Sequence, residues 1–257
     1  MSENPAGNQP PEGTISLQAI SRNLLVGLQR QYDMLAFTLA AIRNEDPTSY
    51  DLYSSLARVM PAPPAHLPHA QMRAYSRALL QRTAVNDLIL LAVEGMHQCH
   101  LLCAFIKERG TDLKGTEAAD RRVGERQKAF VTAKLQDKFE ILERDFGIVS
   151  ELEDALFSLA AALRVLHNGN GQVTNDDISP DGTLVLEFKS VKDTEENGQK
   201  VAKLIDTSRT FRPGERLELT DEELIGMNIT VAKFFDGLFR SVDFYGTNQL
   251  GGGKQDA

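Results

Sequence analysis

Two clusters of residues in this 257-residue chain have side chains that could do chemistry. The first cluster is Arg164, His167 and Asn168, within the stretch LRVLHNGNGQVTNDD. A helix would project Arg164 and His167 from nearly the same side, because they are three residues apart. Histidine can serve as an acid or a base near neutral pH, and arginine can hold a phosphate. The three residues are therefore candidates for binding or cleaving an RNA backbone.

The same stretch also has the composition of an ordinary helix end. Asparagine and glycine, present here as HNGNG, are favoured at helix C-termini. A cation in the last turn interacts favourably with the helix dipole. Local sequence therefore leaves two interpretations of this stretch open, a functional site and a helix terminus.

The second cluster is His97, Cys99, His100 and Cys103, all of them types that bind zinc. On a helix the last three would fall within about one third of the circumference. A closed zinc site usually takes ligands from two elements, and the sequence offers no second cluster to complete it. We therefore expect the cysteines to act as small buried hydrophobic residues, and we expect no metal and no cofactor.

Composition restricts the class of protein. The net charge of −8 argues against a protein that coats duplex nucleic acid without specificity, although it leaves room for a local basic site. The two cysteines lie four apart in a helical pattern, which favours a reducing, cytoplasmic setting over a disulfide framework. The N-terminus lacks the features of a signal peptide. The most apolar segment, AVNDLILLAVEGM, predicts a buried core helix, so we expect no membrane association.

The chain divides into five predicted segments. Residues 1–13 are polar and rich in Pro and Gly, which predicts disorder. Residues 14–60 form a helical pair, and the proline-rich stretch 61–68 is a stiff linker. Residues 69–246 form the main helical bundle, and 247–257 are a flexible tail.

Apolar residues at three-to-four spacing predict about six helices. The N-terminal pair spans 15–44 and 49–60, and the bundle begins with a long helix from 69 to 108 that stops at Gly110. One helix continues from the charged region after residue 110 to about 146. The remaining two begin at capping boxes, one formed by Ser150 and Glu153 and one by Thr220 and Glu223.

A short β-like insert is expected before the last helix. Residues 183–188, TLVLEF, are typical of a strand, and ERLELT at 215–220 is a candidate second short strand. The stretch KDTEENGQK between them is expected to be a loop. The sequence therefore predicts a mainly α fold with one small β element.

The order of these segments resembles that of the HEPN superfamily over roughly residues 80 to 245. The resemblance lies in the helix ELEDALFSLAAALRVLHNGNGQVT and the later phrase GERLELTDEEL. It implies a bundle of four or five helices that commonly dimerises, so that two Arg…His motifs meet in a shared cleft. Active members are metal-independent RNases, often toxins or parts of anti-phage systems. Others bind RNA, nucleotides or a partner protein without cleaving RNA.

The chain departs from the catalytic pattern of that superfamily. His167 and Asn168 match its His-Asn pair, but Ala162 stands five positions before His167, within the interval where the family places its arginine. Arg164 would have to substitute for it. The motif is therefore degenerate.

Three functions follow from these observations. The first is a HEPN-like dimer that acts through RNA or a partner protein in bacterial stress or phage defence, with weak or no nuclease activity. The second is an RNase in which His167 moves the proton, Arg164 stabilises the phosphate and Asn168 orients the backbone. The third is an adaptor that binds a partner protein through residues 14–60 and has no role with nucleic acid.

Overall fold

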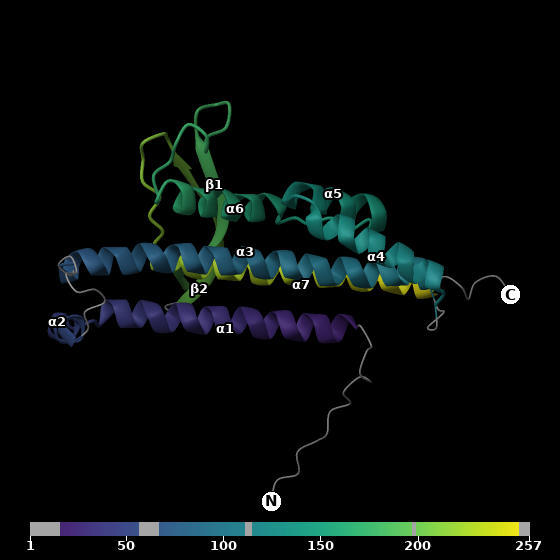
Figure 1. The fold of residues 1–257 in the computed structure, drawn as a ribbon, viewed down its shortest axis with the longest axis horizontal. Coiled ribbons are helices and arrows are strands. Elements are labelled where there is room, and N and C mark those ends of the chain that lie inside the picture. The colour runs from purple at the N-terminus through teal and green to yellow at the C-terminus, as the bar shows by residue number, and fades with distance from the viewer. Residues whose placement is uncertain (1–15, 57–66, 111–114, 197–198, 252–257) are drawn as a thin grey trace, which may run out of the picture.

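The computed structural model describes residues 16–56, 67–110, 115–196 and 199–251. These residues form seven helices and one two-stranded antiparallel sheet (Figure 1), so the predicted mainly α fold is confirmed. The helices are α1 (Leu17–Arg43), α2 (Pro47–Leu56), α3 (His69–Arg109), α4 (Glu117–Thr132), α5 (Leu135–Phe146), α6 (Glu153–Asn168) and α7 (Asp221–Gly251). The strands are β1 (Leu184–Glu196) and β2 (Gln199–Phe211).

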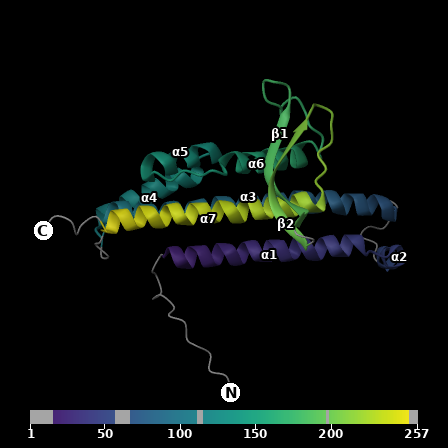
Figure 2. The same ribbon diagram turned by 180° about the vertical axis from the view of Figure 1, so that it is seen from behind.

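The long helices α3 and α7 lie side by side and form the middle of the molecule. Helix α1 covers one side of this pair, and α4, α5 and α6 cover the other (Figures 1 and 2). The first turns of α7 also pack against β1. Because α1 packs on both central helices, it contributes Ile20, Leu24 and Leu28 to the same hydrophobic core as the rest of the chain.

The apolar face predicted for the last helix is confirmed. Its seven residues are all buried, and they pack against α3 and the base of the hairpin. The helix continues to Gly251, past Gly246, where the sequence predicts its end. The seven buried residues are Leu224, Met227, Val231, Phe234, Phe235, Leu238 and Val242.

Of the two capping boxes predicted at helix starts, one is confirmed and the other is wrong. Thr220 and Glu223 form the expected capping box, because each backbone N–H donates to the other side chain, at 2.8 and 3.2 Å. The capping box predicted for Ser150 is wrong. Its Oγ instead accepts from the N–H of Leu152 at 3.2 Å, and α6 begins only at Glu153.

The single helix predicted between the charged region and residue 146 is also wrong, because the chain breaks into α4 and α5 at Ala133. Ala133 has an extended backbone, with φ −68° and ψ 151°. The ammonium group of Lys138 donates to the carbonyl oxygens of Phe130, Val131 and Ala133 at 2.6, 3.0 and 2.5 Å. A tertiary hydrogen-bond cluster therefore satisfies carbonyl groups that the end of α4 leaves without helical partners.

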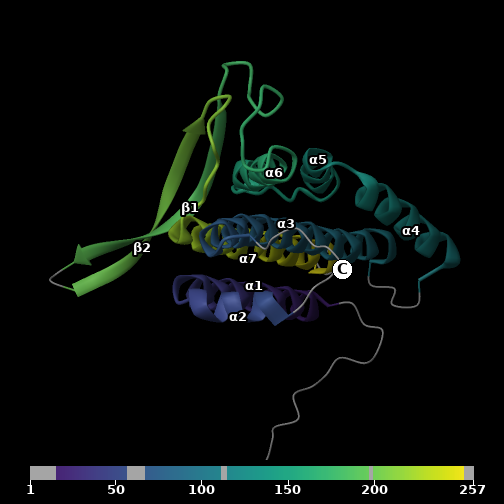
Figure 3. The same ribbon diagram turned by 60° about the vertical axis from the view of Figure 1, so that its left-hand side comes forward.

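The β insert is a longer hairpin than the sequence predicts (Figure 3). The two strands pair from Leu184 opposite Phe211 to Glu196 opposite Gln199, so the described residues of the stretch expected to be a loop, 192–196 and 199–200, lie within the strands. Residues 215–220 form no strand, and only Arg216 makes an isolated bridge, to Gln172. The apolar alternation that marks a half-buried strand is confined to the base of the hairpin, where Leu184, Leu186 and Phe188 are buried.

Several predictions fall wholly or partly on residues outside the described ranges. These are the disordered N-terminus at 1–13, most of the linker at 61–68 and the end of the tail at 252–257. Among the described residues one helix, α3, is long and apolar enough to cross a membrane. Val85, Leu88, Ala92 and Met96 of this helix are buried in the core, which is how a central core helix packs.

Candidate functional site

Arg164, His167 and Asn168 lie in the last two turns of α6, as the sequence predicts. All three side chains are exposed. The cap residue Gly169 donates its N–H to the carbonyl oxygen of Val165 at 3.1 Å. The three candidates therefore share one helix end, but they stand on the surface of the protomer.

Arg164 is held by an aspartate that sequence reasoning did not consider. Its Nε donates to Oδ1 of Asp177 at 2.9 Å, and Asp177 is buried. The other carboxylate oxygen accepts from the N–H and the hydroxyl of Thr174 at 3.0 and 2.7 Å. Arg164 therefore ties α6 to the loop that follows it, which is a structural role.

The pKa of Asp177 predicts how this anchor responds to acid. Burial raises the pKa, but hydrogen bonds from Thr174 and the ion pair with Arg164 outweigh burial and hold it below its usual range. Because the pKa of Asp177 is lower in the folded state, its ionised carboxylate stabilises the fold at pH values above the unfolded-state pKa of about 4. This stabilisation is lost as the pH falls through the folded-state pKa.

We predict that Asp177→Asn lowers the free energy of unfolding by about 2 kcal/mol at neutral pH, because a neutral amide replaces a buried hydrogen-bonded carboxylate. Urea denaturation followed by circular dichroism at neutral pH and near pH 4 tests this. The difference between wild type and variant should shrink in acid. A difference that stays constant with pH would show that Asp177 does not act through its charge.

The turn after α6 brings together two segments that are distant in the sequence. They are HNGNG and GERL, which both belong to the stretches that resemble the HEPN superfamily. Asn170 and Gly171 have positive φ angles of 48° and 87°. A Cβ on Gly169 would lie 2.1 Å from the carbonyl oxygen of Gln172, so only glycine fits there. The carbonyl oxygen of Gly171 accepts from the N–H of Leu217 at 2.7 Å. The HNGNG turn therefore lies against the segment GERL.

A cavity of about 650 Å³ opens beside this turn, and we call it the arginine cavity. Its walls come from α3, from the HNGNG turn, from the end of β2 and from residues 216–220. Four arginines line it, together with apolar residues and uncharged polar residues and one glutamate. The lining includes Arg77, Arg82, Arg209, Arg216, Leu166, Asn170 and Glu218.

Carboxylates and backbone oxygens hold three of the four arginines. Arg77 pairs with Asp221 at 2.5 Å, and Arg209 pairs with Glu223 at 2.9 Å. Arg216 pairs with Glu218 at 3.0 Å, although both side chains are mostly exposed. These pairs fix the direction of each guanidinium group at the cavity wall.

Arg82 differs from the other three arginines. Its Nε is buried, and within the part of the chain that the structure describes this side chain has no ion pair and no hydrogen bond. A buried donor without an acceptor is costly, so such a group in a cavity wall is a candidate ligand contact. The cavity therefore presents one uncompensated positive charge to whatever enters it.

Sequence reasoning missed the arginine cavity because its residues are scattered along the chain. Arg77 and Arg82 lie five residues apart on the long helix α3, and Arg209 and Arg216 follow more than a hundred residues later. The only available signal is the predicted proximity of the HNGNG and GERL segments.

The zinc-ligand cluster is part of the core. Cys99 and Cys103 are fully buried, and burial raises the pKa of both thiols, that of Cys103 to about 12. His100 stacks on Phe130 with the ring centroids 4.0 Å apart, and its Nδ1 lies 2.7 Å from Oε1 of Gln127. Among the described residues, no group of three or more His, Cys, Asp or Glu side chains is arranged to hold a metal.

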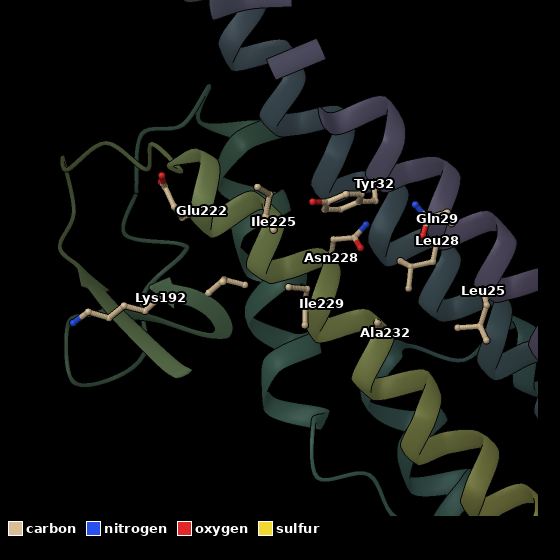
Figure 4. Close-up of a pocket in the computed structure, with 11 residues that line it drawn as sticks. Leu25, Leu28, Gln29, Tyr32, Lys192, Glu222, Ile225, Asn228, Ile229 and Ala232 are labelled. Carbon is tan, nitrogen blue, oxygen red and sulfur yellow. The ribbon is translucent and has the colours of Figure 1, made fainter. Parts of the chain in front are cut away.

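A second hollow lies between α1 and α7, under the hairpin (Figure 4). Its volume is about 890 Å³, and its walls are mostly apolar, with Leu25 and Tyr32 on α1 and Ile225 on α7. Asn228 in its wall is buried. This groove suits an apolar group, in contrast to the arginine cavity.

Comparison of the chain with protein-family models, curated proteins and solved structures finds no match.

Proposed function

We propose that the protein binds a phosphate-bearing ligand, a nucleotide or one nucleotide unit of an RNA, in the arginine cavity, and that it does so without cleaving it. The observation that carries the proposal is Arg82, a half-buried arginine whose buried Nε has no partner in the described structure, in a cavity with three further arginines. Guanidinium groups form bidentate, charge-assisted hydrogen bonds with phosphate oxygens.

The size and the chemistry of the cavity agree with such a ligand. Small-molecule sites usually measure about 300 to 1,000 Å³, and the arginine cavity falls within this range. Leu166 and Leu217 offer apolar surface for a base, while Arg82 and Asn170 offer donors. The overall negative charge favours a local site of this kind over a surface that coats nucleic acid.

In the protomer, the arginine that the nuclease alternative requires is not available to a phosphate. Arg164 is engaged by Asp177, and His167 is exposed without a hydrogen bond among the described residues. A general acid or base needs a positioned partner for the phosphate charge that develops in the transition state. We therefore propose a HEPN-like binding protein with a degenerate catalytic motif, in agreement with Ala162 at the expected arginine position.

Isothermal titration calorimetry with inorganic phosphate and adenosine 5′-monophosphate, and fluorescence anisotropy with a short labelled polyadenylate RNA, test the proposal. We expect Arg82→Gln to weaken binding by about tenfold or more, since it removes a charge-assisted contact. The matched control is Arg240→Gln, the same substitution on an exposed arginine of α7 outside the cavity, which should bind as wild type does.

Two results would contradict the proposal. One is wild-type protein that binds none of the three probes. The other is Arg82→Gln protein with wild-type affinity. Incubation of the RNA with wild type and with His167→Ala in the presence of a chelator tests the alternative, and cleavage by the wild type alone would establish the RNase.

A further inference from the structure

Helix α1 has an unusually apolar outward face. One side of the helix buries Leu24, Leu28 and Leu35 against α3 and α7, yet the opposite side is not a charged solvent face. Phe37 is 72% exposed and Val26 is 43% exposed. In a helix of this length, four charged residues are few: Arg22, Arg30, Asp33 and Arg43. A large exposed aromatic side chain among other apolar residues marks an interaction surface.

The outward residues have a regular spacing. Val26, Arg30, Asp33 and Phe37 follow one another at intervals of four, three and four residues, so they fall within an arc of about 60°. This is the spacing of a helix-pairing seam. Val26, Asp33 and Phe37 lie on the side of α1 opposite its buried leucines, and Arg30 lies at the edge of that side, where it also borders a hollow beside α3. We call these four residues the α1 seam.

The α1 seam is self-complementary in one orientation. If two α1 helices lie antiparallel about a two-fold axis between positions 31 and 32, Val26 of each copy faces Phe37 of the other. The same axis places Arg30 of each copy opposite Asp33 of the other. An isologous interface requires such reciprocity, because one patch must fit a rotated copy of itself.

The two charged residues of the seam are free to make this contact. Arg30 has no ion pair or hydrogen bond among the residues that the structure describes. Asp33 accepts only a hydrogen bond from Gln29 in its own helix, at 2.8 Å, and has no ion pair there. Both side chains are exposed. Their opposite charges would meet twice across the axis.

The ends of the chain do not suit the seam. Residues 1–14, MSENPAGNQPPEGT, contain no leucine, isoleucine, valine or aromatic residue. Residues 252–257, GGKQDA, contain none either. Both segments are predominantly polar.

We infer that α1 is a homodimerisation helix, which pairs antiparallel with α1 of a second copy through the α1 seam. This interface lies outside the region of family resemblance. It is on the opposite side of the central helices from α6 (Figure 1), so it holds the two α6 ends apart. It is therefore a different dimer from one with a shared Arg…His cleft, and it does not depend on ligand binding in the arginine cavity.

Sedimentation velocity over a range of micromolar concentrations tests the interface. Wild type should sediment as a dimer. Phe37→Ser should weaken the dimer by about tenfold or more, because a buried aromatic anchor is lost. The matched control is Phe244→Ser, which changes a side chain of similar exposure, 70%, on α7. It should leave the dimer intact.

A charge exchange makes the test specific to the antiparallel seam. Arg30→Asp places two aspartates opposite each other, and Asp33→Arg places two arginines opposite each other, so each variant alone should be monomeric. Mixed together, the two variants should form a heterodimer, since both contacts are then between opposite charges. A folding defect cannot produce association on mixing.

The inference would be overturned by a monomeric wild type at every concentration. It would equally be overturned by a dimer that survives Phe37→Ser or either charge reversal. Variants that stay monomeric after mixing would also overturn it, because the antiparallel register requires them to pair. Circular dichroism of each variant verifies that the helices remain folded.

Discussion

Gly226→Ala is expected to lower the free energy of unfolding by at least about 2 kcal/mol. Gly226 lies in the first turns of α7, where the backbone of β1 crosses the helix. A Cβ at this position would lie 2.1 Å from the carbonyl oxygen of Lys189 and 2.7 Å from Cα of Ser190. Backbone cannot move aside as a flexible side chain can.

The same crossing is fixed by a hydrogen bond. The N–H of Lys189 donates to Oγ1 of the fully buried Thr230 at 2.9 Å. The hydroxyl of Thr230 donates in turn to the carbonyl oxygen of Gly226 at 2.9 Å. A methyl group at position 226 would push β1 away and lengthen this contact, so packing and hydrogen bonding would be lost together.

Gly237→Ala is the matched control for Gly226→Ala. It lies in the same helix, but a Cβ there would have no atom within 4 Å. Helix propensity alone predicts a gain of about 0.5 to 1 kcal/mol at this position. Urea denaturation of both variants therefore separates the steric effect from the propensity effect. Equal stabilities for the two variants would mean that β1 does not press on α7 as described.

The sequence was sufficient for the helices that bury one continuous face. The spacing of the apolar residues in α7 predicted its buried side, and Thr220 with Glu223 predicted its start. These features are local, because periodicity and capping depend on residues within a few turns. The sequence could not give the length of the hairpin. Its outer part lacks the alternation that marks a half-buried strand, because residues 192–196 are all polar and Leu204 and Ile205 are adjacent.

In the candidate site, too, the sequence predicted the local features but not the contacts between distant segments. Local spacing placed Arg164, His167 and Asn168 at one helix end, and they do lie there. Local spacing could not reveal the ion pair between Arg164 and Asp177, since that contact depends on the path of the loop after α6. Nor could it assemble the arginine cavity, whose arginines come from α3 and from segments after β1. Contacts between distant segments are set by tertiary packing, which no local pattern records.

The break between α4 and α5 gives the second large expected effect. We predict that Lys138→Met lowers the free energy of unfolding by about 3 kcal/mol, because three carbonyl groups near the end of α4 lose their shared donor. Lys138 is 3% exposed, and burial lowers the pKa of its ammonium group, an effect that the charge of Asp137 opposes. Methionine has a similar length and fits the apolar part of the site, so the substitution tests the donors themselves.

Lys128→Met is the control, since Lys128 is exposed on α4 and the substitution should change the stability by less than about 0.5 kcal/mol. Thermal and urea denaturation measure both variants. If Lys138→Met were as stable as the control, the backbone at Ala133 would break the helix without help from Lys138. If it is destabilised as expected, a single buried ammonium group explains why one continuous helical pattern folds as two helices, because it stabilises the carbonyl groups that the break exposes.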